Sequence, residues 1–145
     1  MTRRTILFAA ACLVAGTDGH SQTAQKTMKI KFTFNGTPVV AVLEDSATTR
    51  DFLTLLPLKV KFEDYASTEK IAYLPSKLST KGAPSEIDPK AGDVTYYAPW
   101  GNLALFYKDF RRSPDLVKLG RIVEGFDALK AAGSAEITIE RADAQ

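Results

Sequence analysis

The sequence has almost no cysteine and histidine, two residue types that many enzymes use as nucleophiles, bases or metal ligands. Its 145 residues include one cysteine, Cys12, and one histidine, His20, and both lie within the first 21 positions. If that segment is removed on export, no thiolate or imidazole is left for Cys/His or Ser/His catalysis, or for a zinc site built from those ligands. Disulfides are excluded as well, so stability in an oxidising compartment must come from packing. We expect no cofactor and no metal.

The first 21 residues predict a signal peptide. Two arginines precede an apolar run at 6–16, and Gly19 and Ser21 satisfy the small-residue requirement of a signal peptidase. The run is too short to span a bilayer permanently. We therefore expect an exported, periplasmic protein whose mature chain begins near Gln22 and contains no membrane span.

Two other export routes are open beside the favoured Sec signal. The stretch Thr2–Leu7, with its paired arginines, approximates a twin-arginine signal. Acylation of Cys12 would instead give a lipoprotein, although Ala9 stands where such signals usually have leucine.

The chain also lacks an excess of charge of one sign. Its 19 basic and 17 acidic residues give a formal net charge of +2, and the lysines are scattered instead of gathered into a stripe. This pattern is not that of a nucleic-acid-binding surface. We expect a polar tether at 22–27, one folded domain at 28–141, which is a usual domain size, and a short tail at 142–145.

Apolar and polar residues alternate with a period of two along much of the chain, which predicts β-strands. Asn35-Gly36 predicts a type I′ hairpin turn between the first two strands, because both central residues of that turn need positive φ. The expected strands cover residues 30–34, 39–43, 58–63, 70–74, 94–98, 103–107, 116–123 and 137–139, with a further short strand near Leu78.

Two short helices complete the expected fold. Ser46 or Thr48 can cap the first, which Pro57 ends, and residues 126–132 form the second, ended by Gly133. About eight strands and two short helices indicate a mainly β protein, a closed antiparallel barrel with the helices covering its ends.

Several segments resemble cyclophilins. The segment from Leu119 to Leu129, LGRIVEGFDAL, is similar to the stretch in which a cyclophilin strand ends in a Gly-basic-Val-Val-Glu-Gly turn and feeds a short helix. The other similar segments are residues 34–39, 50–52, 92–96 and 101–106. The resemblance covers residues 28–141 and implies a cyclophilin-like barrel of the compact bacterial and archaeal kind.

The resemblance does not extend to the catalytic residues. Cyclophilins isomerise X-Pro bonds with an arginine that hydrogen-bonds the prolyl amide, which lowers a rotation barrier of about 18–20 kcal/mol. Here the corresponding stretch, 61–70, has no arginine, and Leu103 and Leu105 replace the glutamine and phenylalanine of a Gly-Ser-Gln-Phe-Phe strand. The groove histidine has no counterpart, so the catalytic residues are unknown.

The expected function follows from this difference. We expect a cyclophilin-like domain that binds a small ligand or a peptide segment in a groove at the side of the barrel, without efficient prolyl isomerase chemistry. The alternative is a divergent peptidyl-prolyl isomerase acting on envelope proteins. A structural module of an envelope assembly is a third reading.

The candidate groove residues are mostly aromatic. Trp100, the only tryptophan, stands in a Pro-Trp-Gly turn, where it can form a groove wall or pack over the barrel end. The candidates are Tyr65, Lys70, Tyr73, Tyr97, Trp100 and Asn102.

Charged residues have more ordinary interpretations. Lys70 and Arg50 could hold an anion or replace the missing arginine, but lysine lacks the planar fork of that residue. Glu63, Asp64 and Glu69 could serve acid–base chemistry or bind a cation, but a solvated strand end is the better expectation. Residues 111–112, both arginine, are expected in an exposed loop.

Overall fold

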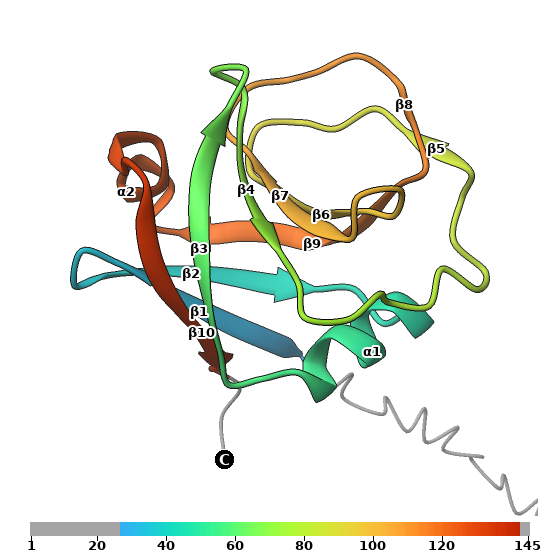
Figure 1. Ribbon diagram of the computed structural model, residues 1–145, viewed down its shortest axis with the longest axis horizontal. Coiled ribbons are helices and arrows are strands. Elements are labelled where there is room, and N and C mark those ends of the chain that lie inside the picture. The colour runs from blue at the N-terminus through green and yellow to red at the C-terminus, as the bar shows by residue number, and fades with distance from the viewer. Residues whose placement is uncertain (1–26, 143–145) are drawn as a thin grey trace, which may run out of the picture.

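The computed structural model of the protein describes residues 27–142 (Figure 1). In chain order the elements are β1 (Met28–Phe34), β2 (Thr37–Leu43), α1 (Ala47–Thr54), β3 (Leu58–Tyr65), β4 (Glu69–Tyr73), β5 (Glu86–Ile87), β6 (Asp93–Tyr97), β7 (Asn102–Phe106), β8 (Ser113–Pro114), β9 (Leu116–Glu124), α2 (Phe126–Ala131) and β10 (Ala135–Arg141). The predicted signal peptide, all but the last residue of the tether, and residues 143–145 lie outside the described part. None of the helices within that part is long and apolar enough to cross a membrane.

Eight strands form a closed antiparallel barrel in the order β1-β10-β3-β4-β7-β6-β9-β2, and β2 pairs again with β1. Closure leaves the barrel no free sheet edge. β5 and β8 form a separate two-stranded sheet at its side (Figure 1). The predicted fold class is confirmed.

The short strand expected near Leu78 is wrong. Leu78 lies in an irregular segment, and the short strand of this connection is β5, further along the chain. Leu78 is buried, and its N–H donates to the Tyr96 hydroxyl at 3.1 Å. An apolar side chain that anchors a loop to the core has the same local signature as a residue of a short strand, because both are buried.

The β1–β2 hairpin forms as predicted. Asn35 and Gly36 have φ values of 49° and 80°, as a type I′ turn requires. Alternate residues of β1 point inward, and the rings of Phe32, Phe34 and Phe62 meet in the barrel core with centroids 5.6–6.4 Å apart.

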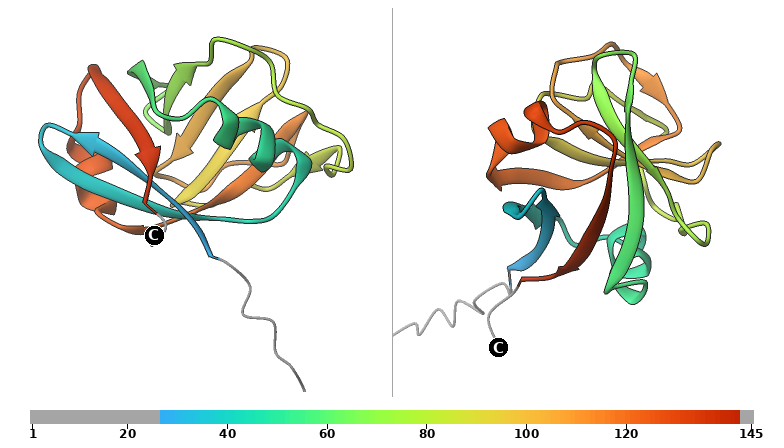
Figure 2. Two further views of the ribbon diagram at one scale, coloured as in Figure 1. Left: turned by 90° about the horizontal axis from the view of Figure 1, so that it is seen from below. Right: turned by 60° about the vertical axis from the view of Figure 1, so that its left-hand side comes forward.

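The two helices lie on opposite sides of the barrel and each contributes to its core (Figures 1 and 2). Ser46 caps α1 by accepting a hydrogen bond from the Thr49 N–H at 3.0 Å, and Phe52 is fully buried beneath the helix. α2 buries Leu129, and Ala132, already extended, ends it one residue before the predicted Gly133.

Two glycines of the cyclophilin-like segment let β9 and the start of α2 pack closely on β2. A Cβ at Gly120 would lie 2.0 Å from the Val42 carbonyl oxygen, and one at Gly125 would lie 2.4 Å from the Pro38 carbonyl oxygen. Gly125 also has φ of +78°, which disfavours other residues. Close approach of two backbones therefore accounts for both glycines.

β6 and β7 are buried on both faces, as their composition predicts. Their inner side chains join the barrel core, while Ile71, Ala104, Phe106 and Leu116 form a second apolar cluster on the outer face of the sheet. The loop after β7 and the β5–β8 pair stand beside this outer face (Figure 1).

Candidate ligand-binding groove

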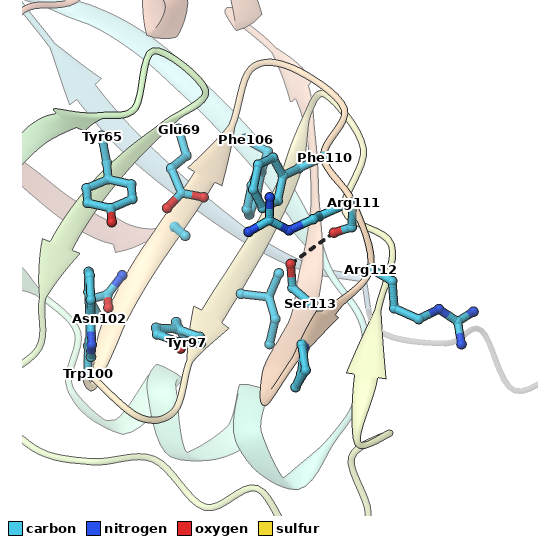
Figure 3. Close-up of a pocket in the computed structure, with 13 residues that line it drawn as sticks. Tyr65, Glu69, Tyr97, Trp100, Asn102, Phe106, Phe110, Arg111, Arg112 and Ser113 are labelled. Carbon is cyan, nitrogen blue, oxygen red and sulfur yellow. Dashed lines mark hydrogen bonds between the residues drawn. The ribbon is translucent and has the colours of Figure 1, made fainter.

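A groove with a cavity of about 280 Å³ lies on the outer face of the barrel (Figure 3). Its floor is formed by Ala104 and Phe106 of β7 and by Leu116 of β9, the two strands on either side of β6. The β3–β4 hairpin, the β6–β7 turn and the loop after β7 supply the walls. Small-molecule sites in proteins usually have about this volume or more, so the groove fits a small group or one side chain.

Three aromatic side chains form one wall. The Trp100 ring meets those of Tyr65 and Tyr97 edge to face, with both centroid distances 5.6 Å. The β6–β7 turn fixes the position of Trp100, because the Gly101 N–H donates to the Tyr97 carbonyl at 2.9 Å and Gly101 has φ of +68°. Trp100 is 48% exposed, so it borders the groove instead of sealing the barrel end.

Glu69 places a carboxyl group in this apolar setting. Sheet register aligns it with Tyr65 on β3 and with Phe106 on β7, so all three side chains share the outer face. Burial raises the pKa of Glu69 to about 7. No ion pair within 4 Å joins it to any residue of the range 27–142. The expectation that Glu69 belongs to a solvated strand end is therefore wrong.

Asn102 gives the groove an acceptor without a partner. Its side chain is 1% exposed, and its Nδ2 donates to the Leu103 carbonyl at 2.9 Å. Its Oδ1 is buried and accepts no hydrogen bond from the described residues. Buried polar atoms are normally satisfied, so this oxygen would gain a partner if the donor of a ligand displaced the side chains that cover it.

The two arginines of the loop after β7 behave differently. Both are exposed, as expected. Arg111 nevertheless lines the groove, with its guanidinium 4.8 Å from the centre of the Phe110 ring. The Arg112 side chain points away (Figure 3), toward Glu86 at 2.8 Å and Asp88 at 3.5 Å, and ties the loop to β5.

Lys70 does not line the groove. Side chains alternate between the two faces of β4, so Lys70 points to the inner face while Glu69 points outward. Its side chain is 5% exposed and pairs with Asp64 at 3.1 Å, and its Nζ also donates to the Ala132 carbonyl at the end of α2. The Tyr107 hydroxyl donates to Asp64 at 2.6 Å. That bond, with help from Lys70, lowers the pKa of Asp64, while burial and Asp64 raise the pKa of Tyr107 to about 12. Lys70 therefore links β3 and β4 to α2.

Two other candidates lie outside the groove. Tyr73 faces Asn102 across the β4–β7 pairing but is 59% exposed beyond the groove. Arg50 pairs with Asp45 beside α1 and borders a different depression of the surface. Neither cation considered as a replacement for the family's arginine therefore reaches the groove.

The two leucines that stand in place of the family's glutamine and phenylalanine do not line the groove. Leu103 and Leu105 point into the barrel core, while their neighbours Asn102 and Ala104 face the groove. A shift of one residue along a strand moves every side chain to the other face, which is why the substitution by leucine gives no information about the groove.

The structure thus brings together four of the six predicted groove residues, Tyr65, Tyr97, Trp100 and Asn102. Sequence reasoning missed the contributions of Glu69, Phe106, Phe110 and Arg111. Strict alternation from Tyr73 back along β4 would have placed Glu69 on the groove side. Across residues 27–142, no group of three or more His, Cys, Asp or Glu side chains could hold a metal ion.

Comparisons with known proteins agree with this fold. Residues 32–140 match the model of a family described as cyclophilin-like. No curated protein matches the chain. The solution structure of a hypothetical protein from Archaeoglobus fulgidus is similar, with a TM-score of 0.60 and 23% sequence identity over 81% of this chain and 96% of that chain. At this identity the likeness shows the fold alone.

Proposed function

Since the chain belongs to the cyclophilin-like family, we propose that it is an exported domain that binds a small ligand or a peptide segment in the groove, without efficient prolyl isomerase chemistry. The observation that carries the proposal is the buried, unpartnered Oδ1 of Asn102 beside an aromatic wall. Membership of the fold family supports a binding site but does not by itself assign an activity.

The composition of the groove supports binding. Tyr65, Tyr97 and Trp100 offer apolar area and polar edges, and Asn102 and Glu69 add acceptors. Sites for small molecules and peptides commonly combine a mainly apolar lining with a few orienting polar groups.

The electrostatics of the groove argue against efficient isomerisation. The guanidinium that lines it, that of Arg111, comes from an exposed loop, where water competes for its hydrogen bonds. Losing a preorganised donor for the transition state typically costs about 10²–10³ in rate. Turnover should therefore be at least about a hundredfold below that of an ordinary cyclophilin.

Arg111 is also the observation that favours the second candidate function, a divergent prolyl isomerase acting on envelope proteins. Its guanidinium stands beside the aromatic rings of the groove, where it could donate to a prolyl amide. In that case the donor would come from the loop after β7 instead of from β3.

A protease-coupled isomerisation assay on short X-Pro peptides separates the two candidates. Binding of the same peptides is followed by Trp100 fluorescence, since Trp100 is the only tryptophan of the sequence. Binding with little turnover supports the proposal. Turnover like that of an ordinary cyclophilin, lost in Arg111→Ala but kept in the matched loop variant Lys108→Ala, would establish the isomerase instead.

Export is a separate part of the proposal. The arginines and apolar run of residues 1–16, followed by Gly19 and Ser21, support cleavage near Gln22 by a signal peptidase. Mass spectrometry of the exported protein measures the new N-terminus directly. A mature chain that begins at an acylated Cys12 would contradict a soluble periplasmic protein.

A further inference from the structure

Two acceptors in the groove have no partner within the described chain. Glu69 is half-buried among aromatic side chains without an ion pair, and the Oδ1 of Asn102 is fully buried without a donor. Removing a carboxylate from water is costly unless a cation or hydrogen bonds compensate it. The groove therefore contains hydrogen-bond acceptors without donors, and a ligand with donor groups would satisfy them.

The surroundings of Glu69 favour a donor that carries positive charge. Tyr65 and Phe106 flank it in sheet register, and Trp100, Tyr97 and Phe110 complete a ring of aromatic side chains along the groove. Aromatic faces attract ammonium groups, and such interactions strengthen where water is excluded. An aliphatic stem would also pack against these rings while its charged end reaches the carboxyl group.

Asn102 extends the site along β7. It stands four residues before Phe106 on that strand, so the two backbone positions are about 13 Å apart. A ligand that reaches both acceptors must be elongated, with a cationic end near Glu69 and a further N–H near Asn102. A lysine side chain together with the backbone of its own peptide has this length and these groups.

Resting on the proposed binding function, we propose that the groove binds an organic ammonium group, with Glu69 as its counter-ion and, for a peptide ligand, Asn102 accepting a further N–H of the same ligand. The ammonium is that of a lysine side chain in a peptide segment or that of a free alkylamine. Both sources present the same chemistry to Glu69.

The positive charge of Arg111 provides a test of the charge of the ligand, because its removal changes the affinity in opposite directions for cations and anions. Arg111 is the other charged side chain that points into the groove, and its guanidinium lies 4.8 Å from the centre of the Phe110 ring (Figure 3). For a cationic ligand Arg111 is a like charge, so Arg111→Gln should strengthen binding. For an anionic ligand the same variant should weaken it.

The affinity should rise with pH through neutrality. Burial holds the pKa of Glu69 near 7, so the fraction ionised grows about tenfold between pH 6 and pH 8. The other titratable groups that line the groove are Tyr65, Tyr97, Arg111 and Arg112, and Tyr107 lies close enough to feel the Glu69 charge. Phenols and guanidinium groups do not ordinarily titrate in that interval, and a ligand amine stays protonated.

The test compares three ligands on the mature full-length chain by calorimetry and Trp100 fluorescence. They are acetyl-Ala-Lys-Ala-amide, the same peptide with norleucine in place of lysine, and n-pentylamine. We expect the lysine peptide to bind at least about tenfold more tightly than the norleucine peptide, and about tenfold more tightly at pH 8 than at pH 6. Binding by n-pentylamine as tight as that of the lysine peptide would assign the ammonium to a free amine.

Variants and an independent ligand separate the possible failures. Glu69→Gln should abolish both the preference for lysine and the pH dependence. If the lysine and norleucine peptides bind equally, or if only an X-Pro peptide binds, the ammonium site is overturned although the groove still binds ligands. If no peptide or amine gives heat or changes Trp100 emission, the proposed binding function is overturned as well.

Discussion

Glu69 of β4 lies directly opposite Phe106 of β7, so a carboxyl group and an aromatic ring share the outer face of the barrel. This pairing is the reason that Glu69 loses water without gaining an ion pair. It gives the groove a carboxyl group that changes charge near neutral pH.

Glu69→Gln should make stability less dependent on pH. The folded pKa of about 7 lies above the ordinary value of 4.5, so the native state holds the proton more tightly than the unfolded chain. The stability linked to Glu69 is therefore fully present below pH 4.5 and is lost as pH rises through about 7. Because the carboxyl keeps some contact with water, we expect a loss of about 1–2 kcal/mol between these limits.

Urea denaturation at pH 4.5 and pH 8 measures this loss. The exposed carboxylate Glu136 on β10 offers a control, since Glu136→Gln should leave the difference between the two pH values unchanged. A wild-type protein and a Glu69→Gln variant with the same pH dependence would contradict the assignment.

The β3–β4 turn can be made more stable. Ala66 and Ser67 have φ values of 51° and 52°, which cost L-residues about 1–2 kcal/mol each relative to ordinary conformations. Ser67→Gly should raise the free energy of unfolding by about 1 kcal/mol, after the greater freedom of glycine in the unfolded chain is allowed for. Asn35→Ala should lower it, because it puts alanine into the same conformation in the β1–β2 turn. Thermal denaturation shows whether the two changes have opposite signs.

Gly120→Ala should be severely destabilising. The added methyl would overlap the Val42 backbone, which cannot move without breaking the β2–β9 pairing, so we expect a loss of about 3 kcal/mol or more. Gly133→Ala is the matched control, because nothing lies within 4 Å of its added Cβ. Chemical denaturation of both variants tests this, and similar losses in the two would rule out close backbone approach as the cause.

Breaking the Lys70–Asp64 pair should depend on which partner is removed. Asp64→Asn leaves a buried ammonium without its counter-ion and should cost about 2–4 kcal/mol, whereas Lys70→Met leaves a carboxylate that water still reaches and should cost less. The Tyr107 hydroxyl and Lys70 lower the pKa of Asp64 below its ordinary 3.8, so its contribution is present above that value and is lost as pH falls through the folded pKa. Denaturation at neutral and acid pH should show the Asp64→Asn penalty shrinking in acid. Equal penalties for the two variants would indicate that the pair contributes packing alone.

Local sequence was sufficient for the barrel strands, the two helices and the class of the fold, but not for the short strands β5 and β8. The alternation around Phe32 and Phe34, the Asn35-Gly36 turn and the Ser46 cap depend on neighbours within a few residues, so the chain itself reports them. The cyclophilin-like segment with Gly120 and Gly125 depends on close contact with β2, yet its residue pattern was recognisable before that contact was known.

The groove required the tertiary structure. Which of Glu69 and Lys70 faces outward follows from the register of β4 between β3 and β7, and a shift of one residue would exchange them. Arg111 reaches the groove because barrel closure and the Arg112 ion pairs bring its loop beside β7. Sequence by itself therefore determined the eight barrel strands, the β1–β2 turn and the two helices, since their causes are local. The β5–β8 pair and the charge, acceptors and walls of the groove arose from contacts between residues far apart along the chain.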